Sequence, residues 1–360
     1  VWVIAWAGLA FVCSLIGNVW ALLNPWNTLF LWAEQAYGAA TGRRLSRGLA
    51  CPPGMGSWPA VILFAIFAWM EISWPGGAVP RNIAIALTIY SAITWTGMFL
   101  TSREEWLERG EAFHNVFGTF ARFSITEGRA GPAGREWNLR PPGVGLRVGK
   151  LPNAGLMVFI LMLLATVSWD GFTETEQSKR IALEAFYMIQ DIGRLAVPIV
   201  ELIGLAAFPI LFIAVYLIFM AAVGAMGGDV RDTFRLARIL VYSIVPIAIA
   251  YHLSHYYTLL AIDGQLLISR ISDPFGFGWD LFGTAGHKVD IAVVSARSVW
   301  FISVGAIVIG HVAAVYLAHA EALKFYRDRG RALRSQLPML VLMVGYTMIS
   351  LWIIAQPIVA

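Results

Sequence analysis

The sequence predicts an all-α fold, a polytopic transmembrane helical bundle of about eight spans with amphipathic helices at the membrane interface. Of the 360 residues, 58% are hydrophobic and only 13% are charged, which is far more apolar than a soluble domain. Several apolar runs reach the roughly 20 residues that cross about 30 Å of hydrocarbon. Many of the 15 tryptophans lie near the ends of these runs, as in an interfacial aromatic belt. We therefore expect extensive contact with the lipid bilayer.

We interpret the chain as a single integral membrane domain, 1–360. Residues 1–150 contain three spans with a cytoplasmic amphipathic helix and loop, and residues 151–360 contain five. The predicted spans are 1–23, 58–74, 82–101, 152–169, 196–225, 239–262, 298–320 and 336–358. The fifth is longer than a perpendicular crossing, so it either tilts or breaks near Pro209. Because Val1 already stands at the start of an apolar span, we expect an N-terminal part to precede it.

Lys and Arg are distributed unevenly between the two sets of loops. One set holds 19 of them and the other seven. The richer set is 24–57, 102–150, 226–238 and 321–335, and the poorer set is 75–81, 170–195 and 263–297. The bias predicts that the richer set is cytoplasmic and that both termini are extracytoplasmic. The net charge of +4 then reflects topology and not nucleic-acid binding.

The segments between spans have patterns of their own. Residues 25–40 and 103–125 have mixed apolar and polar faces, as in helices that lie on a membrane. For 103–125, packing of its aromatic side chains on the protein's own helix ends explains the pattern equally well. Residues 127–150, rich in Gly, Pro and Arg, predict an irregular loop. The 172–192 segment is helical and amphipathic, and the turn-forming residues of 263–297 predict a folded extracytoplasmic cap.

Ionisable side chains at depth are the candidate functional groups, because such groups are costly within a bilayer. His252 lies near the middle of the sixth span, His255 is about 4.5 Å further out, and His311 lies near the middle of the seventh. We therefore expect an outward-facing cavity. Its predicted residues are Glu71, Glu201, His252, His255 and His311, beneath the loop that carries Asp273 and Asp280.

This set of side chains fits metal chemistry. Imidazoles and a carboxylate bind zinc, copper or iron, and an open coordination position activates water. The predicted metal ligands are His252, His255 and His311, and the predicted catalytic carboxylates are Glu201, Asp273 and Asp280. Alternatively, two histidines on neighbouring helices, His252 and His311, hold a haem. The sequence does not distinguish between a metal, a haem and no cofactor.

A purely structural explanation stands beside these alternatives. Each histidine is also explained by a hydrogen bond to a neighbouring helix. Glu71, next to an interfacial tryptophan, is simplest as a side chain that extends to the membrane surface. Cys13 and Cys51 suggest no disulfide framework. The chain also lacks a Gly-x-Ser-x-Gly elbow, a phosphate-binding Gly-Lys-Ser/Thr loop and a Cys-x-x-Cys pair.

Six stretches carry a resemblance to a known family. They are NPWNTLF, REEWLERGEAFHNVFGTFARF, YHLSHYYTLL, SDPFGFGWDLFGTA, GHVAAVYLAHAEAL and RSQLPMLVLMVGYT. Together they resemble the bacterial multi-pass membrane proteins known as fenitrothion hydrolases, over most of the chain. The resemblance implies a bacterial inner-membrane location, an additional N-terminal part and hydrolysis of aryl phosphorothioate triesters.

Three functions are therefore open. The first is a metal-dependent hydrolase of organophosphorus-type esters, in which Glu201 is a ligand or base. The second is a non-enzymatic subunit of a larger respiratory or photosynthetic membrane complex. The third is a transporter in which Glu201 and the histidines relay protons or ions. The sequence has no evident internal repeat, which disfavours an inverted-repeat transporter.

Overall fold

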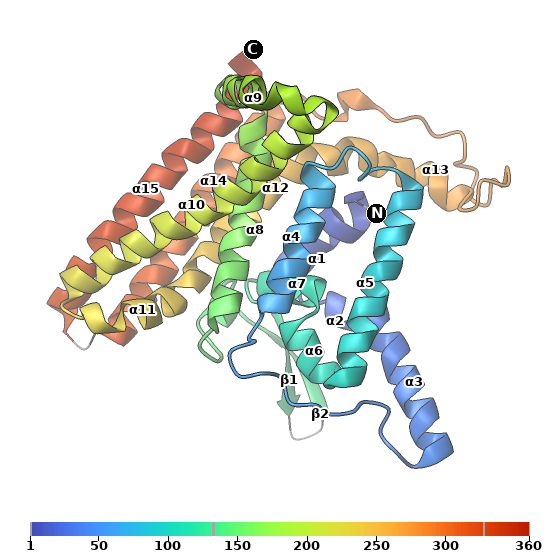
Figure 1. Cartoon of the computed structure of the whole chain (residues 1–360), viewed down its shortest axis with the longest axis horizontal. Coiled ribbons are helices and arrows are strands. Elements are labelled where there is room, and N and C mark those ends of the chain that lie inside the picture. The colour runs from blue at the N-terminus through green and yellow to red at the C-terminus, as the bar shows by residue number, and fades with distance from the viewer. Residues whose placement is uncertain (1, 132–133, 327, 360) are drawn as a thin grey trace.

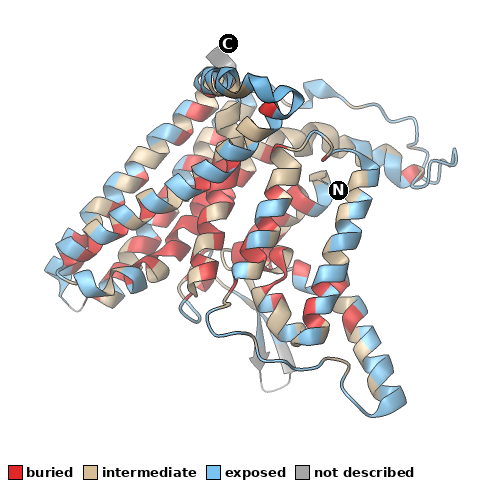
Figure 2. Ribbon diagram, in the orientation of Figure 1, coloured by how far each residue is buried: buried red, intermediate tan, exposed pale blue. Residues whose placement is uncertain are grey.

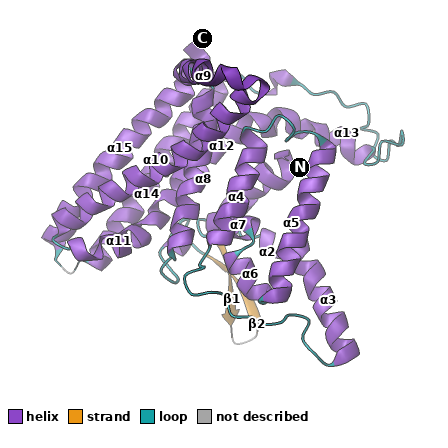
Figure 3. Cartoon of the chain, viewed as in Figure 1, coloured by secondary structure: helices purple, strands orange, loops and turns teal. Residues whose placement is uncertain are grey.

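The computed structural model describes residues 2–131, 134–326 and 328–359, which form a helical bundle with one small sheet (Figures 1 and 3). The α-helices are α1 Leu9–Leu15, α2 Trp20–Leu23, α3 Pro25–Thr41, α4 Trp58–Ile72, α5 Pro80–Leu100, α6 Arg103–Arg109, α7 Ala112–Ala121, α8 Ala154–Thr173, α9 Glu176–Ile189, α10 Ala196–Gly227, α11 Thr233–Leu240, α12 Val245–Ile262, α13 Leu266–Ser272, α14 Ala296–Phe325 and α15 Arg329–Val359. The strands are β1 Thr126–Gly131 and β2 Gly134–Leu139, and a π-helical segment, η1, spans Trp2–Gly8. Short 3-10 segments are η2 Val144–Leu146, η3 Gln190–Leu195, η4 Val230–Asp232, η5 Val241–Ile244, η6 Asp263–Gln265 and η7 Ile291–Val293.

Six helical segments are long and apolar enough to cross a membrane, among the residues that the structure describes. They are Pro80–Leu100, Ala154–Thr173, Glu176–Gly227, Val230–Ser272, Ala296–Phe325 and Arg329–Gln356. These segments coincide with six of the predicted spans. The other two coincide with shorter apolar helices, Trp2–Leu15 and Trp58–Ile72, so the expected count of about eight is not confirmed. The helical, membrane-capable fold is confirmed.

The first predicted span, 1–23, is interrupted near Gly17. Helix α1 ends at Leu15, and the chain that enters β1 then pairs with this end. The backbone N–H of Ile125 donates to the Leu15 carbonyl at 3.3 Å, and that of Thr126 donates to the Ile16 carbonyl at 3.1 Å. A Cβ on Gly17 would lie 2.2 Å from Thr126 Oγ1. Glycine thus permits the close approach that breaks the run into α1 and α2.

The segment 103–125 forms two helices, α6 and α7, instead of one. Helix α7 lies inside the molecule, where it contacts α1 and α4. Phe117 is fully buried and Phe120 is 3% exposed. The aromatic face of α7 therefore packs on the protein's own helices, which decides between the two interpretations of this pattern.

The expectation of an irregular loop at 127–150 is corrected by the structure. Strands β1 and β2 pair in an antiparallel hairpin, with Thr126 opposite Leu139 and Gly128 opposite Trp137. Arg140 fixes the base of the hairpin, because its Nη2 donates to the Ala121 carbonyl at 2.7 Å and its Nε to the Ser124 carbonyl at 3.1 Å. Pro142 and Gly143 form the turn after β2, whereas Gly128 lies within β1.

Helix α10 passes through Pro209 without ending there, which settles the behaviour of the long fifth span. It runs obliquely across the bundle beside α15 (Figure 1). Its outer face carries exposed apolar side chains, among them Ile210 at 67% and Leu211 at 62%. Such a face suits contact with lipid.

Helix α12 is the central element of the bundle, in contact with α8 and α14 (Figure 2). Its first half, from Val245 to His252, is buried. The approach of α14 depends on Gly310, where an added Cβ would lie 2.6 Å from Ala250 Cβ and 2.8 Å from the Pro246 carbonyl oxygen. Small residues at such a crossing let two membrane helices pack closely.

The loop 263–297 begins with η6 and α13 and then continues as a mostly exposed chain (Figure 2). Its turns depend on glycines with positive φ, such as Gly276 at 71° and Gly278 at 80°. Figure 1 shows this exposed part extending away from the helices. The expected compact cap over the bundle is therefore only partly formed, by α13 and its flanking turns.

Candidate functional site

A histidine and an aspartate from two packed helices form the best-defined ionisable pair in the membrane-capable part of the fold. His255 belongs to α12, and Asp170 belongs to the last turns of α8. His255 Nε2 lies 2.7 Å from Asp170 Oδ2, and the two side chains are 29% and 26% exposed. This distance is that of a charge-assisted hydrogen bond. The carboxylate fixes the imidazole and selects the tautomer with Nε2 protonated.

His255 also lines a cavity of about 420 Å³. This volume lies within the roughly 300–1,000 Å³ range of small-molecule sites. Besides His255, its polar lining residues are four with hydroxyl groups and one carboxylate: Tyr251, Ser254, Thr258, Ser303 and Glu174. Most other lining residues are apolar, and they come from α8, α12, the start of α14 and α15: Val167, Ile262, Val299, Trp300, Ile353 and Ile354. The cavity thus offers apolar contact area beside one positioned imidazole.

A second polar group lies next to the His255 ring. Tyr256 donates from its hydroxyl to Glu71 Oε1 at 2.6 Å and accepts from Trp6 Nε1 at 3.0 Å. Its ring contacts that of His255 with a centroid separation of 4.7 Å. Glu71 is therefore bound within the protein, and the expectation that it simply extends to the membrane surface is corrected. Glu71 stays within the protein because the Tyr256 hydroxyl on α12 donates a hydrogen bond to it.

His252 faces a different environment from His255. It is 4% exposed and is surrounded by the rings of Trp6, Phe11, Phe120 and Tyr256, with centroid separations of 5.2, 5.5, 5.8 and 4.5 Å. The space beside it amounts to about 10 Å³. Such a volume holds about one water molecule and no larger ligand.

His311 lies on the opposite side of α12. Its Nδ1 is 2.8 Å from the carbonyl oxygen of Ile307, one turn earlier in α14. Its ring is 5.8 Å from that of Tyr346 in α15, and Tyr346 also contacts Tyr251, the residue before His252. Neighbouring positions on a helix point in directions about 100° apart. His252 and His311, which the sequence placed at similar depth, therefore have different surroundings.

The predicted carboxylates do not join the histidines. Glu201 is partly exposed on α10 and does not line the cavity beside His255. Asp273 accepts the backbone N–H groups of Phe277 and Gly278 at 2.9 and 2.8 Å. Asp280 accepts the N–H of Ala285 at 2.9 Å. The two aspartates hold the turns of their own loop, which explains their spacing without a catalytic role.

Within the described ranges, no three His, Cys, Asp or Glu side chains are grouped so that they could hold a metal ion. The predicted ligand set of His252, His255 and His311 is divided among three environments. The structure brings His255 together with Asp170, and Glu71 together with Tyr256. It does not bring Glu201, Asp273 or Asp280 to either pair.

Asp170 and Tyr256 were not among the predicted site residues. Asp170 directly follows the predicted fourth span, 152–169, where a charge usually marks the end of a span. Tyr256 belongs to the YHLSHYY stretch and is one of two adjacent tyrosines. The position of Asp170, as the first carboxylate after that span, could have marked it as a candidate. Its pairing with His255 could not be predicted, because it depends on the packing of α8 against α12.

Comparisons with known proteins give no further guide to the function. No family model, no curated protein and no solved structure matches this chain.

Proposed function

We propose that the chain is an integral membrane hydrolase whose site is the cavity beside the His255–Asp170 pair. The observation that carries this proposal is the 2.7 Å contact between His255 Nε2 and Asp170 Oδ2, at a residue that lines an apolar cavity of about 420 Å³. A carboxylate that orients an imidazole raises its ability to accept a proton. His255 Nδ1 then carries the lone pair that can accept a proton from a water molecule.

The substrate class follows from the walls of the cavity. The mostly apolar lining, with Glu174 as its one carboxylate, favours a neutral molecule over an anion, because an anion would lose hydration and be repelled by that carboxylate. A neutral aryl ester of phosphorus fits this requirement. The resemblance to the fenitrothion hydrolases supports the same class. The positive-inside bias supports an inner-membrane protein in which the cavity opens toward the extracytoplasmic side.

The proposed reaction uses one base and one water molecule. The water oxygen attacks phosphorus while His255 accepts one of its protons, and Asp170 stabilises the imidazolium that forms. The bond from phosphorus to the aryl oxygen breaks, and the aryloxide leaves with the electron pair. The imidazolium returns its proton to the aryloxide, which leaves as a phenol, and the second product is the dialkyl phosphorothioate, whose acidic proton passes to the solvent. No redox partner is required.

The test is hydrolysis by the purified chain in lipid nanodiscs. A phosphorothioate triester with a nitrophenyl leaving group allows product release to be followed by absorbance. We expect His255→Gln to lower kcat/KM by about 100-fold or more, and Asp170→Asn by a smaller factor. The matched controls are His287→Gln and Asp191→Asn, which change exposed residues outside the cavity. Full activity in His255→Gln would overturn the proposal.

Activity of the isolated chain also separates an enzyme from a subunit that works only within a larger membrane complex. Stable co-purification with redox subunits, without hydrolysis by the isolated chain, would favour the subunit.

A second candidate function, proton-coupled transport, is favoured by the polar groups next to His255. Glu71 is joined to the Tyr256 hydroxyl, and the Tyr256 ring contacts that of His255, which is joined to Asp170. Carboxylates and histidines within membrane spans are the usual parts of proton relays. In liposomes, this function predicts solute flux that depends on a pH gradient and is lost in Glu71→Gln.

A further inference from the structure

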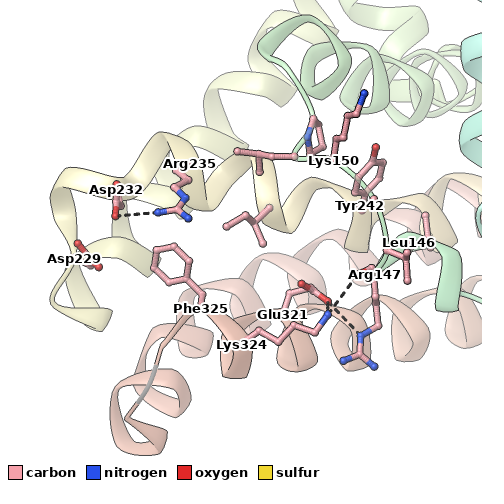
Figure 4. A pocket seen from close by; sticks show the side chains of 15 residues that line it. Leu146, Arg147, Lys150, Asp229, Asp232, Arg235, Tyr242, Glu321, Lys324 and Phe325 are labelled. Carbon is pink, nitrogen blue, oxygen red and sulfur yellow. Dashed lines mark hydrogen bonds and ion pairs between the residues drawn. The ribbon is translucent and has the colours of Figure 1, made fainter. Parts of the chain in front are cut away.

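A second large cavity lies at the opposite ends of the membrane-capable helices, away from His255. It has a volume of about 460 Å³. Its walls come from the 146–152 loop, the start of α11 with the residues around it, and the last turns of α14 (Figure 4). Because α10 ends at Gly227 and α14 at Phe325, the cavity is placed where two apolar helices leave a bilayer. Lipid headgroups occupy that level.

Positive charge exceeds negative charge in the lining. The basic side chains are those of Arg147, Lys150, Arg235 and Lys324, and the acidic ones are those of Asp229, Asp232 and Glu321. Four cations against three carboxylates leave a formal charge of +1. The carboxylates are not evenly placed. Figure 4 shows Asp229 and Asp232 at one end with Arg235, and Arg147 with Glu321 and Lys324 at the other, while the Lys150 amine points away from Glu321.

The second end of the cavity has cations that outnumber their partners. Glu321 Oε1 lies 3.2 Å from Arg147 Nε and 2.7 Å from Lys324 Nζ, so one carboxylate serves two cations. Lys150 takes part in none of the ion pairs between described residues. This end therefore holds two cations around a single carboxylate, which favours an added anion.

The same cavity has an apolar side. Leu146, Val148, Leu151, Ile239 and Phe325 line it together with the charged residues. Val148 and Leu151 are 55% and 40% exposed, although both lie near the ends of membrane-capable helices. Arg235 also lies over the Phe325 ring, 5.9 Å from its centroid. An occupant with both a phosphate and a hydrocarbon part matches this combination, whereas a purely ionic one leaves the apolar wall uncovered.

We propose that this cavity binds the phosphate headgroup of an anionic phospholipid, with Arg147 and Lys324 at the phosphate and the apolar wall against the acyl chains. The cations bind the phosphate group, and the apolar wall favours a phosphate that belongs to a lipid over free phosphate. The inference is independent of the hydrolase proposal, because the two cavities share no residue.

Binding of short-chain lipids to the purified, delipidated protein tests this proposal. The probes are dioctanoyl phosphatidylglycerol, dioctanoyl phosphatidylcholine and inorganic phosphate, each titrated in a zwitterionic detergent. We expect phosphatidylglycerol to bind at least tenfold more tightly than the other two. In the Arg147→Gln, Lys324→Gln double variant its Kd rises at least tenfold, and added salt weakens binding to the unchanged protein.

The matched control is Arg231→Gln, which removes a cation from an exposed position on η4 that does not line the cavity. It should leave the Kd unchanged. Equal binding of phosphatidylglycerol and phosphatidylcholine to the unchanged protein would overturn the proposal, and that comparison does not depend on any variant's folding. If inorganic phosphate bound as tightly as phosphatidylglycerol, the site would be one for a soluble anion, and the lipid proposal would be wrong.

Discussion

His255 Nε2 and Asp170 Oδ2 lie 2.7 Å apart, on helices α12 and α8, which pack against each other. The pair is thus held by the packing of two membrane-capable helices and not by a flexible loop. A base held in this way keeps its orientation when a ligand enters, which is what general base catalysis requires. The predictions below address the helix contacts around the pair, its polar neighbours and its chemistry.

The crossing of α12 and α14 depends on Gly310. Gly310→Ala should destabilise the protein by about 1–3 kcal/mol, because the new methyl group meets the Pro246 carbonyl and Ala250. Thermal unfolding in detergent, followed by circular dichroism, measures the effect. Gly305→Ala, on the same helix, is the control, since a Cβ there meets no atom within 4 Å. Equal stability of the two variants would contradict the prediction, because it would mean that α12 and α14 need no glycine at their crossing.

The Tyr256 hydroxyl serves two buried partners. Tyr256→Phe should cost about 1–3 kcal/mol of stability, because the Glu71 carboxyl and the Trp6 indole N–H both lose a partner. Tyr257→Phe removes the neighbouring hydroxyl, for which the described residues include no hydrogen bond, and should change stability little. An equal effect of both substitutions would mean that the Glu71–Tyr256–Trp6 group contributes no special stability.

Glu111 organises the N-terminal part of the fold. It is fully buried and accepts hydrogen bonds from Trp20 Nε1 at 3.3 Å, Asn24 Nδ2 at 3.0 Å, the Tyr90 hydroxyl and the His114 N–H at 2.7 Å. Glu111→Ala should destabilise the protein by about 3 kcal/mol or more, since it leaves several buried donors unpaired. The exposed Glu108 provides the control, Glu108→Ala. Chemical unfolding in detergent measures both variants.

The same residue predicts a pH dependence. Burial raises the pKa of the Glu111 carboxyl, and the hydrogen bonds from Tyr90 and Trp20 oppose this shift. A carboxyl whose pKa is raised in the folded state contributes stability below its unfolded pKa and loses it as pH rises through the folded pKa. Unfolding measured from about pH 4 to about pH 8 should therefore show a decreasing cost of Glu111→Gln. A cost that increases with pH would contradict the shift.

Removal of metal distinguishes catalysis by the His255–Asp170 pair from catalysis at the metal site that the sequence predicted. If His255 and Asp170 act without a metal, a chelator should leave the hydrolysis rate unchanged. The ground for this expectation is the separation of His252, His255 and His311 into different environments. Loss of activity in chelator, with recovery on addition of zinc, would instead support a metal at one of these histidines. Elemental analysis of the same samples provides the control.

Much of the fold could be predicted from hydrophobic run length, because a bilayer imposes a minimum length on an apolar helix. That rule fails for the first predicted span, where Gly17 accepts the close approach of Thr126. It also missed the hairpin at 126–139, whose strands are set by pairing with each other and with the end of α1. The contact of β1 with the end of α1 joins segments far apart in the chain, so it leaves no local period.

The candidate site could be predicted only in part. His255 was identified from its depth, and its partner Asp170 was not. Residue spacing gives the height of a side chain along a helix, but its direction depends on which neighbours the helix has. His252 and His311 show this, because the sequence placed them at similar depth and they contact Trp6 and Tyr346 respectively. A charge near the end of a span, such as Asp170, is indistinguishable in sequence from a solvated one.

A double-mutant cycle on His255 and Asp170 tests most directly whether the two side chains act as one proton-transferring unit. The measurement is kcat/KM for a nitrophenyl phosphorothioate triester in nanodiscs, for the unchanged protein, His255→Gln, Asp170→Asn and the double variant. Residues that act as a unit are non-additive. We predict that the double variant is no slower than His255→Gln alone. Additive losses, or a rate that is unchanged in His255→Gln, would contradict the proposed role of the pair.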